Sequence, residues 1–408
     1  MIGNNINFLT YNVKGLQQKQ KRVKIYNYVK EKVKHGCVLL QETHSCDNDQ
    51  KTWETEWDGK IYQNHGSSNS RGVSIGFTKN FDYTELKYEQ DNCGRLQLLS
   101  FKYEEDVFLI INLYNNNGEA EQMETLKKLD SLLSRFDNIL EHKIIIGGDW
   151  NFIQNANLDA FGGNPCLKLN SIAELLKIKQ KYDLCEIFRV RHPLDKRFTY
   201  FRRTPYLARR LDFFLVSSVM QDKIDKCTIL PSLSSDHSPV LLSVKVSKNE
   251  FKRGRNYWKF NNTLINNQSF CDELKRVIES EKLGLAEIEP QMKWELIKFK
   301  IRDFTRKFSK KIAMEKRENQ IKWEEIVKCY ETSASNDNFV TENEYSAAKD
   351  GLENLHNERT TGYILRSKIQ WYEEGEKSSK FFLNLEKKKS CTKYNTNHNG
   401  SRMDSNGF

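Results

Sequence analysis

The feature that most constrains the fold is a set of short apolar runs, some of which contain no polar residue at all. Ile144, Ile145 and Ile146 follow one another directly. Successive side chains of a strand point to opposite faces, so a strand built from such a run is apolar on both sides. It needs cover on both faces, either by helices or by a second sheet. The pattern predicts a layered α/β sandwich.

Residues 1–248 contain runs rich in β-branched and aromatic residues, which predict strands, and runs with a helical period, which predict helices. The expected strands are Ile6–Tyr11, Val38–Gln41, Gly72–Phe77, Leu96–Tyr103, Val107–Leu113, Lys143–Ile146, Leu211–Val216 and Val240–Val246. The expected helices are Lys21–Lys34, Glu119–Phe136 and Ser171–Lys181. Strands therefore outnumber helices in this part of the chain.

Proline usage indicates the domain organisation. Of the six prolines, only Pro290 lies beyond residue 248, which favours a loop-rich first domain at 1–248 and a mainly helical region at 258–390. Residues 249–257 between them include several basic side chains and are predicted to form a linker. Residues 391–408, rich in Asn, Ser and Gly, are predicted to be disordered.

One segment of the helical region has a clear amphipathic pattern. Apolar residues recur at spacings of three and four, namely Trp294, Ile297, Ile301, Phe304 and Phe308. Lysine and arginine occupy the remaining arc of this predicted helix. Two interpretations remain open: a packing stripe with a solvated charged face, or a basic face that binds nucleic acid.

Composition narrows the cellular setting. The chain has 65 Lys and Arg against 55 Asp and Glu, a net charge of +10. Its apolar runs are far shorter than the ~18 residues that span a bilayer, and the N-terminus lacks the layout of a secretory signal. Nine cysteines without a C-x-x-C pair indicate reduced thiols. We expect an intracellular protein, nuclear or cytoplasmic and without membrane contact; no pattern indicates an oligomeric state.

One short stretch contains residues that could bind zinc. His35, Cys37, His44 and Cys46 offer four zinc-capable side chains within a short stretch. The first pair enters an apolar strand, whereas structural zinc ligands usually lie on tight turns. A buried thiol with surface histidines is therefore favoured over a zinc site.

Several acidic and amide side chains stand where predicted strands begin or end. Asn12 and Glu42 follow two strands, Asp149 and Asn151 follow a third, and Asp212 lies at the start of another. Strand ends are where sheets present functional groups. A carboxylate beside an apolar strand is costly to bury unless a cation or hydrogen bonds compensate. Carboxylate and amide oxygens suit Mg²⁺, so the set predicts a divalent metal site.

The segment Ser235-Asp236-His237 places a carboxylate beside an imidazole, just before a predicted strand. A histidine held by a buried aspartate can donate to a phosphate oxygen as charge builds there. The alternative is a simple Asx or Ser turn, with the imidazole satisfied by a nearby carbonyl.

Five segments resemble, in order, the motifs of the endonuclease/exonuclease/phosphatase superfamily, which includes DNase I and the AP endonucleases. They are Asn12-Val13-Lys14-Gly15, Gln41-Glu42-Thr43, Gly148-Asp149-Trp150-Asn151, Arg210-Leu211-Asp212-Phe213 and Ser235-Asp236-His237. The resemblance covers roughly residues 5–246. It implies a four-layered α/β sandwich, with two packed sheets flanked by helices, that hydrolyses phosphoesters with Mg²⁺ or Mn²⁺.

The resemblance also implies roles for single residues. Glu42 would be the main metal ligand, with Asn12 beside it holding metal water or phosphate and Asp236 at the metal edge. Asp149, supported by Asn151, would orient and deprotonate the attacking water.

On the phosphate side, His237 would stabilise the pentavalent phosphate, and Asp212 would hold its ring through the other nitrogen. Tyr114 would contact the phosphate or the leaving oxygen. The sequence departs from the family at Asn116, where proline is often found.

We call residues 189–210 the basic stripe, because they hold eight cations against the single Asp195, interleaved with aromatic residues. This composition suits a polyanionic duplex, although a solvated hairpin is the ordinary alternative. Arg202 and Arg203 are candidates for entering a minor groove, and Thr199 is placed near the phosphate by the resemblance. The predicted DNA-binding residues are Thr199, Arg202, Arg203, Arg209 and Ser235.

Two features separate branches of the superfamily. Abasic-site enzymes commonly have an aromatic residue three positions before the aspartate that matches Asp212, and this chain has Arg209 there. Residues 364–382 resemble the segment upstream of the polymerase fingers in LINE-type non-LTR retrotransposon proteins. No Tyr/Phe-x-Asp-Asp motif occurs in the sequence, so the chain looks like an element truncated before its reverse transcriptase.

The sequence therefore predicts a metal-dependent DNA endonuclease that nicks one strand and leaves a 3′-hydroxyl. Its expected partners are double-stranded DNA and element RNA, the latter through the C-terminal region. The alternatives are an abasic-site repair nuclease and an inert nucleic-acid-binding relic.

Overall fold

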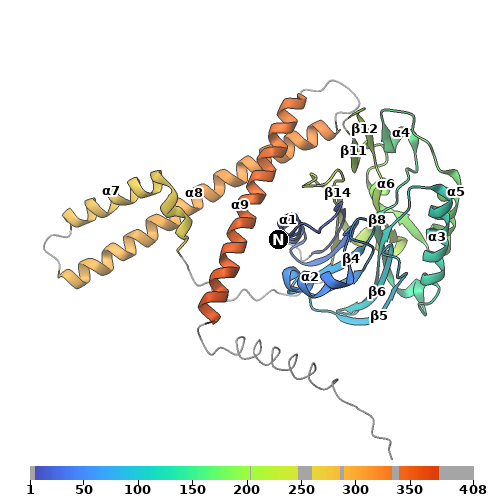
Figure 1. Ribbon diagram of the computed structural model, residues 1–408, viewed down its shortest axis with the longest axis horizontal. Helices are drawn as coiled ribbons and strands as arrows, with labels where there is room; N and C mark the ends of the chain where they lie inside the picture. Colours follow the sequence, from blue (N-terminus) through green and yellow to red (C-terminus); the bar gives the residue numbers. More distant parts are fainter. Residues whose placement is uncertain (1–4, 203, 247–259, 285–288, 333–339, 376–408) are drawn as a thin grey trace, which may run out of the picture. The chain divides into compact units, whose positions relative to one another are not determined.

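The computed structural model describes residues 5–202, 204–246, 260–284, 289–332 and 340–375 (Figure 1). The chain divides into two compact units, residues 1–353 and 354–408. The described part of the second unit is the C-terminal portion of helix α9 (Glu342–Gly375). The expected linker at 249–257 and tail at 391–408 lie outside the described residues. A domain boundary at residue 248 remains a prediction.

Two six-stranded mixed sheets form the centre of the first unit. The first sheet has the order β14 (Ile224–Ile229), β15 (Val240–Lys245), β1 (Asn5–Asn12), β2 (Gly36–Gln41), β4 (Val73–Phe77), β3 (Ile61–Asn64). The second has the order β10 (Leu184–Glu186), β13 (Asp212–Ser217), β8 (Lys143–Asp149), β7 (Asp106–Tyr114), β6 (Leu96–Tyr103), β5 (Thr84–Gln90). Each sheet contains one parallel pair, β1 with β2 and β7 with β8, among antiparallel pairs.

The remaining elements flank or follow the sheets. A small third sheet comprises β11 (Tyr200–Arg202), β12 (Leu207–Arg209) and β9 (Ala160–Phe161). The helices are α1 (Lys19–Val33), α2 (Gln50–Trp57), α3 (Glu119–Leu133), α4 (Ala156–Asp159), α5 (Leu169–Lys181), α6 (Ile187–Arg191), α7 (Gln268–Gly284) and α8 (Pro290–Thr332). Within the described segments, 3-10 turns cover Asp47–Asp49, Ile139–Glu141, Ser218–Lys223 and Asn262–Asn266.

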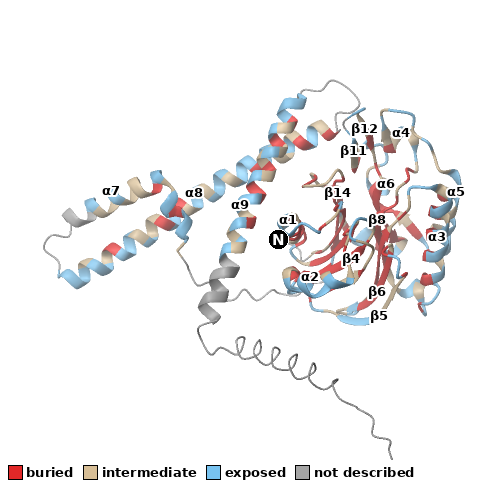
Figure 2. Ribbon diagram, in the orientation of Figure 1, coloured by how far each residue is buried: buried red, intermediate tan, exposed pale blue. Residues whose placement is uncertain are grey.

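Three apolar cores separate four layers. The central core lies between the sheets and includes Phe8 and Ile145. A second core joins the β6–β7–β8 sheet to α3 and α5 and includes Ile144 and Ile146. The third packs α1 and α2 on the other sheet. The side chains of β8 thus enter cores on both faces of their sheet, and Figure 2 shows buried residues concentrated in the strands. The predicted four-layered sandwich is confirmed.

All the expected strands and helices of residues 1–248 are present, with ends that differ by a few residues. Sequence reasoning missed the shorter or more polar strands, among them β3, β5 and β14. It also ended one strand too early, because β8 continues from Ile146 to Asp149. This continuation requires glycine at position 148. A Cβ there would lie 2.0 Å from the carbonyl oxygen of Leu113 on the neighbouring strand and would clash with it.

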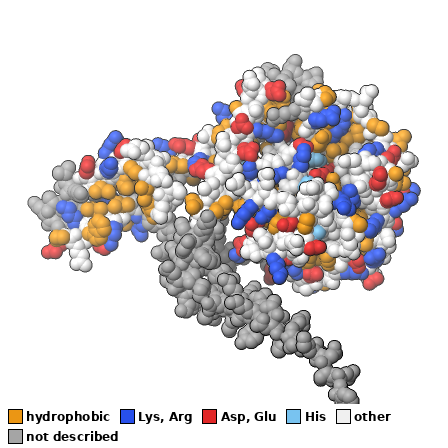
Figure 3. All heavy atoms as spheres, in the orientation of Figure 1, with side chains coloured by type: hydrophobic (Ala, Val, Ile, Leu, Met, Phe, Trp, Pro, Cys, Tyr) orange, Lys and Arg blue, Asp and Glu red, His pale blue; other side chains and the backbone are white. Residues whose placement is uncertain are grey.

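The helical stripe is correct in part. Ile297 and Phe308 of α8 are each 8% exposed, and Phe308 packs with Phe270 of α7. Trp294, predicted to belong to the stripe, is 57% exposed. Figure 3 shows hydrophobic side chains visible over the α7–α8 hairpin, and Lys and Arg interspersed with Asp and Glu elsewhere on this face. Among the helices that the structure describes, none has the length and apolar character that a membrane span requires.

Candidate functional site

Side chains from both sheets meet at one edge of the sandwich. Asn12 and Tyr114 are the last residues of β1 and β7, and Asp149 is the last of β8. Glu42 follows β2, and Asp212 begins β13 directly opposite Asp149. We call these five the strand-end residues. The parallel pairs β1–β2 and β7–β8 bring their carboxyl ends to the same edge, which explains the convergence.

A pocket of about 330 Å³ opens at this edge. It is lined by Lys14, Glu42, Asn117, Asp149, Asn151, Tyr200, Leu211, Asp236 and His237. Side chains that are far apart in the sequence therefore share one cleft. Sequence reasoning missed Lys14, Asn117, Tyr200 and Leu211 as lining residues. Lys14 and Leu211 had a signal, because each lies inside one of the quoted motifs, and Tyr200 belongs to the aromatic residues of the basic stripe.

Asn12 links the two sheets. Its Nδ2 donates to Asp149 Oδ2 at 2.9 Å and to Glu42 Oε1 at 3.1 Å. Its Oδ1 accepts the backbone N–H of Lys14 at 3.1 Å, which fixes the orientation of the amide. The side chain is 1% exposed, so these bonds form away from bulk water. Asn12 thus holds two carboxylates of different sheets at a fixed separation.

Glu42 is held in its ionised form. It has a positive φ of 51°, which turns its side chain at the end of β2. Burial raises the pKa of Glu42, but hydrogen bonds from His44, Tyr114 and Asn12 outweigh burial and lower that pKa to about 2. The Tyr114 hydroxyl donates to Glu42 Oε1 at 2.7 Å. An ionised carboxylate at the mouth of a pocket is a natural ligand for a hard cation.

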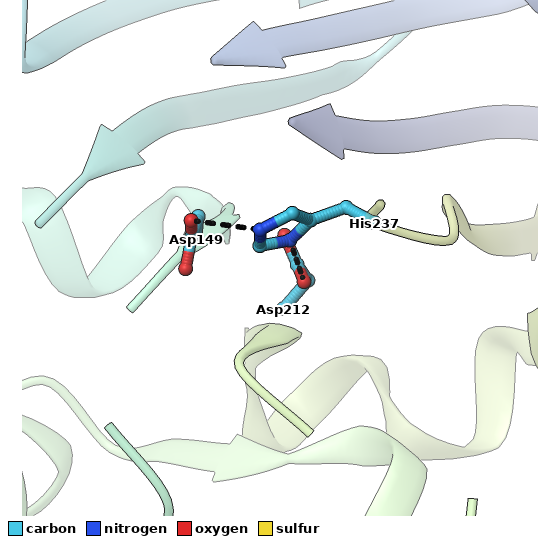
Figure 4. Close-up of side chains that lie close together, drawn as sticks. All are labelled: Asp149, Asp212 and His237. Atoms are coloured by element: carbon cyan, nitrogen blue, oxygen red, sulfur yellow. Dashed lines mark hydrogen bonds and ion pairs between the residues drawn. The ribbon is translucent and has the colours of Figure 1, made fainter. Parts of the chain in front are cut away.

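Asp149, Asp212 and His237 form a buried cluster, with the imidazole between the two carboxylates (Figure 4). His237 Nδ1 is 2.8 Å from Asp212 Oδ2, and Nε2 is 3.9 Å from Asp149 Oδ2. Burial lowers the pKa of His237, but the two aspartates raise it more strongly, so the pKa lies above its usual value. Burial and the neighbouring Asp212 carboxylate raise the pKa of Asp149. The imidazole is thereby favoured as a cation that can donate from Nε2.

The donor set fits a divalent metal. Ligand atoms of Asp149, Asp212 and His237 all lie within 4.8 Å of one another, so these three could hold an ion. Among the described residues no hydrogen-bond donor reaches the buried Oδ1 of Asp212. Glu42 offers a further carboxylate beside them, since Asn12 Nδ2 bonds both Glu42 and Asp149. An oxygen-rich set with net negative charge and little solvent calls for a cation.

The loop after Asp149 is fixed by several contacts. Asn151 has a positive φ of 54°, and its N–H donates to Asp149 Oδ1 at 3.0 Å. Its Nδ2 donates to the Asn115 carbonyl at 2.9 Å, and its own carbonyl accepts from Gln122 Nε2 and Lys168 Nζ, each at 3.0 Å. The loop of Tyr114 is tied to the same centre by a 2.7 Å bond from Gln122 to the Asn116 carbonyl.

The segment that carries His237 is attached to β1. Ser235 Oγ donates to the Asn12 carbonyl at 2.8 Å and accepts the His237 N–H at 3.2 Å. Asp236 lines the pocket, and its Oδ2 lies 2.6 Å from Lys14 Nζ. Ser235 is therefore engaged within the protein, whereas Asp236 and Lys14 face the cleft.

The basic stripe divides into internal and surface residues. Arg210 is 2% exposed and donates to Asp159 at 2.8 Å and to Glu186 at 3.1 Å. Arg189 donates to the same Asp159 at 2.7 Å. The composition of the stripe suggested cations available to a duplex; that interpretation is wrong for these two, because they neutralise buried carboxylates.

The predicted DNA-binding residues are placed differently from one another. Thr199 is fully buried, and its Oγ1 accepts the N–H groups of Leu211 and Asp212 at 3.0 Å, so it positions Asp212. Arg209 donates to the Phe161 and Gly162 carbonyls at 2.7 and 2.8 Å. Arg202 is exposed on β11, and Arg203 lies outside the described residues. DNA contact by any of them stays a prediction.

The candidate zinc ligands do not assemble. Within the part of the chain that the structure describes, His35, Cys37, His44 and Cys46 form no group with ligand atoms close enough to share an ion. Cys37 is a buried residue of β2, and His35 Nε2 is 3.1 Å from the Tyr103 hydroxyl. His44 instead approaches Glu42, with Nε2 3.8 Å from Oε2.

The protein resembles known proteins in sequence and in fold. It is 25% identical over 369 residues to the Transposon TX1 uncharacterized 149 kDa protein of Xenopus laevis, covering 88% of this chain and 27% of that protein. The chain thus spans about a quarter of the relative's length. The structure matches AP endonuclease LMAP from Leishmania major with a TM-score of 0.50 and 19% identity, over 60% of this chain and 88% of that one.

A further structural match is the endonuclease domain of TRAS1, a telomere-specific non-LTR retrotransposon, with a TM-score of 0.44 and 14% identity over 60% of this chain and all of that one. The model of the Endonuclease/Exonuclease/phosphatase family matches residues 9–237, more than half of the chain. That match runs from β1 to His237 and includes all the strand-end residues. The resemblance seen in the sequence is confirmed: the chain belongs to the Endonuclease/Exonuclease/phosphatase family.

Proposed function

We propose that this protein is a metal-dependent DNA endonuclease that nicks one strand of a duplex, as in target-site cleavage by a non-LTR retrotransposon. The observation that carries the proposal is the convergence of Glu42, Asp149 and His237 on one pocket. The similarity to a transposon protein and the exposed cations of the basic stripe support DNA as the substrate. Hydrolysis would leave a 3′-hydroxyl and a 5′-phosphate, and action on chromosomal DNA would take place in the nucleus.

Glu42 and Asn12 would hold Mg²⁺, with Asp236 at the edge of the same pocket. These residues present oxygens, which Mg²⁺ prefers, and Mn²⁺ would also be accepted. The adjacent set of Asp149, Asp212 and His237 includes an imidazole nitrogen that is already committed to Asp212 at 2.8 Å. When bound, the ion would neutralise charge on the scissile phosphate.

Asp149 would position the attacking water and accept its proton. The raised pKa of this carboxyl suits a general base, because proton transfer is most efficient when the pKa of the base is near the working pH. Asn12 Nδ2 and the Asn151 N–H each bond one carboxylate oxygen of Asp149 and so fix its orientation. The water would then attack phosphorus in line with the leaving oxygen.

His237 would donate a hydrogen bond from Nε2 to a phosphate oxygen on which negative charge accumulates. Asp212 holds the ring through Nδ1 and favours the charged imidazolium. Thr199 in turn holds the backbone of Asp212. Tyr114 would assist at the leaving oxygen or the phosphate, from a hydroxyl that already contacts Glu42. Stabilisation of this kind typically contributes about 10²–10³-fold per donor.

Substrate binding would combine phosphate contacts and groove contacts. Lys14 faces the pocket and Arg202 is exposed on the hairpin, and both would neutralise phosphates of the bound strand. Arg203 is proposed to enter the minor groove with Arg202. We also propose that the basic arc of α8 contacts element RNA, since its lysines and arginines are largely exposed.

A plasmid assay tests the function. Supercoiled DNA incubated with the full chain and Mg²⁺ is expected to become nicked circles. Nicking should disappear with a chelator and in Glu42→Gln and Asp149→Asn. Tight DNA binding without nicking would support the alternative of an inert relic. Preference for an abasic duplex over an intact duplex would support a repair nuclease instead, an activity carried by the structurally similar AP endonuclease.

A further inference from the structure

A second cavity of about 380 Å³ lies next to the proposed catalytic pocket. Asp236 lines both, so the two cavities share a wall. The sandwich contributes Phe201, Tyr206, Ser235 and Asp236 to the second cavity. Its opposite wall comes from helices α8 and α9, beyond the part of the chain that the family model matches. All of these residues belong to the compact unit 1–353.

The helical wall is aromatic and carries one cation. Tyr330 and Tyr345 stack with ring centroids 4.2 Å apart, and Tyr206 meets Tyr330 edge-on at 6.5 Å. Lys349 Nζ lies 5.2 Å from the centre of the Tyr345 ring. Glu342, at the start of α9, completes this wall. The aromatic rings thus run from the β11–β12 hairpin onto the helices.

Ion pairs attach the helical wall to the sandwich. Lys24 and Lys32 of α1 pair with Glu353 at 2.6 Å and with Glu324 at 2.7 Å. Their side chains are 10% and 16% exposed. The carboxylate partners Glu353 and Glu324 are 45% and 28% exposed, so solvent still screens the pairs, and each contributes modestly to holding the helices against α1. The cavity is therefore built jointly by the sandwich and the helices.

The lining chemistry favours a base over a phosphate. Asp236 is already paired with Lys14 at 2.6 Å, and Glu342 offsets the single ammonium of Lys349, so the lining offers no surplus positive charge to a phosphate. Aromatic rings stack on bases of any sequence, because every base has a π-face. A carboxylate can accept a hydrogen bond from an exocyclic amino group, as Asp and Glu do from cytosine. The volume lies within the range of about 300–1,000 Å³ that is typical of ligand sites.

We propose that this cavity binds one unstacked nucleobase with an exocyclic amino group, from the DNA strand beside the scissile phosphate. The inference rests on the proposed function, because DNA must occupy the neighbouring pocket. Helices α8 and α9 would then contribute directly to the choice of cleavage site. Unstacking a base costs energy, and stacking on the aromatic rings together with the contact to Glu342 compensates for it.

The experiment uses the full chain and a set of synthetic duplexes. The nick is first mapped on a natural sequence with Mg²⁺. Each nucleotide near the nick is then replaced in turn by adenine, cytosine, guanine, thymine or a base-lacking residue. Both the nicking rate and the affinity, by fluorescence anisotropy with Ca²⁺ in place of Mg²⁺, are measured. The variants are Glu342→Ala and, on the other wall, Tyr206→Leu. Asp350→Ala on the same helix is the matched control, and thermal melts check folding.

At one position, removing the base should lower affinity and kcat/KM about tenfold, and thymine should be disfavoured. Glu342→Ala should abolish the discrimination against thymine there, Tyr206→Leu should reduce the loss caused by a missing base, and Asp350→Ala should change neither. The inference fails, and the proposed function stands, if the wild type nicks DNA but no base position affects the rate or the affinity. The same holds if such an effect exists and Glu342→Ala leaves it unchanged. If the wild type binds without nicking, the proposed function fails, and the inference, which rests on it, fails with it. If it does neither, both fail.

Discussion

The strand-end residues lie together in the structure, whereas the cations of the basic stripe do not, although residue type indicates a function for both sets. The strand-end residues gather at one edge of the sandwich, where Glu42 and Asp149 line the pocket, because the strands of the two sheets fix where their ends lie. The stripe runs through short strands and loops, and its cations separate: Arg210 is 2% exposed, whereas Arg202 is exposed on β11. The position of a residue at the end of a regular strand can therefore be predicted from sequence. For a charge-rich loop, the sequence does not show which cations face solvent.

The largest effect is expected within the buried cluster. His237→Ala should reduce the nicking rate by about 10²–10⁴-fold, because the phosphate loses its positioned donor. DNA affinity should change much less, since most affinity comes from phosphate contacts. Single-turnover nicking and anisotropy measure the two quantities. His142→Ala, remote from the pocket residues, is the control; equal losses in the two variants would contradict the account.

The second expected effect is on stability, which should distinguish the buried arginines of the basic stripe from the exposed ones. Arg210→Met should lower the free energy of unfolding by roughly 3–5 kcal/mol, because Asp159 and Glu186 keep buried charge without a partner. Arg202→Met should change it by less than about 0.5 kcal/mol, as expected of a surface site. Urea unfolding of both variants at pH 7 gives the comparison. Similar stabilities would mean that the stripe does not divide as described.

A third prediction tests the helical part of the first unit through pH. Burial raises the pKa of Glu331 in α8 from 4.5 to about 7. Between these values the folded protein binds more protons than the unfolded chain, so this group stabilises the fold fully below pH 4.5 and loses that contribution as pH rises to about 7. Glu331→Gln should therefore be more stable than wild type at pH 8 by roughly 1–3 kcal/mol.

At pH 4.5 the same two proteins should melt at nearly the same temperature, because the wild-type carboxyl is then largely neutral when folded. The Tyr345 hydroxyl, 3.3 Å from Glu331 Oε1, can also bond the amide of the variant. Thermal melts at both pH values provide the measurement. A stabilisation that is identical at the two values would show that Glu331 ionises normally.

The smallest expected effect is on the salt dependence of DNA binding. Arg202→Gln should reduce the slope of log K against log salt concentration by about 1, because one phosphate contact is lost. Lys102→Gln on β6, a residue that lines neither cavity, should leave the slope unchanged. Anisotropy titrations over a range of salt concentrations decide between them, and equal slopes for wild type and Arg202→Gln would remove Arg202 from the interface.

Much of the fold could be predicted from local sequence patterns. The convergence of the site residues is then a consequence of the fold. The isoleucine run at 144–146 predicted a strand covered on both faces, and its side chains do enter two cores. The roles of Thr199 and Arg210 could not be read in the same way. Thr199 holds Asp212 across 13 positions and Arg210 meets Asp159 across 51, and no local period records such pairings. Sequence patterns show which residues can act, whereas contacts show which are already engaged.

The proposed mechanism requires the strand ends to gather around one cation. Crystals of the full chain soaked in Mn²⁺ and measured at the manganese absorption edge test it most directly. One anomalous peak is expected in the pocket, within about 2.0–2.6 Å of a Glu42 carboxylate oxygen. Glu42→Gln should lose the peak. A peak that stays in Glu42→Gln, or no peak at the edge shared by β1, β2 and β8, would contradict the account.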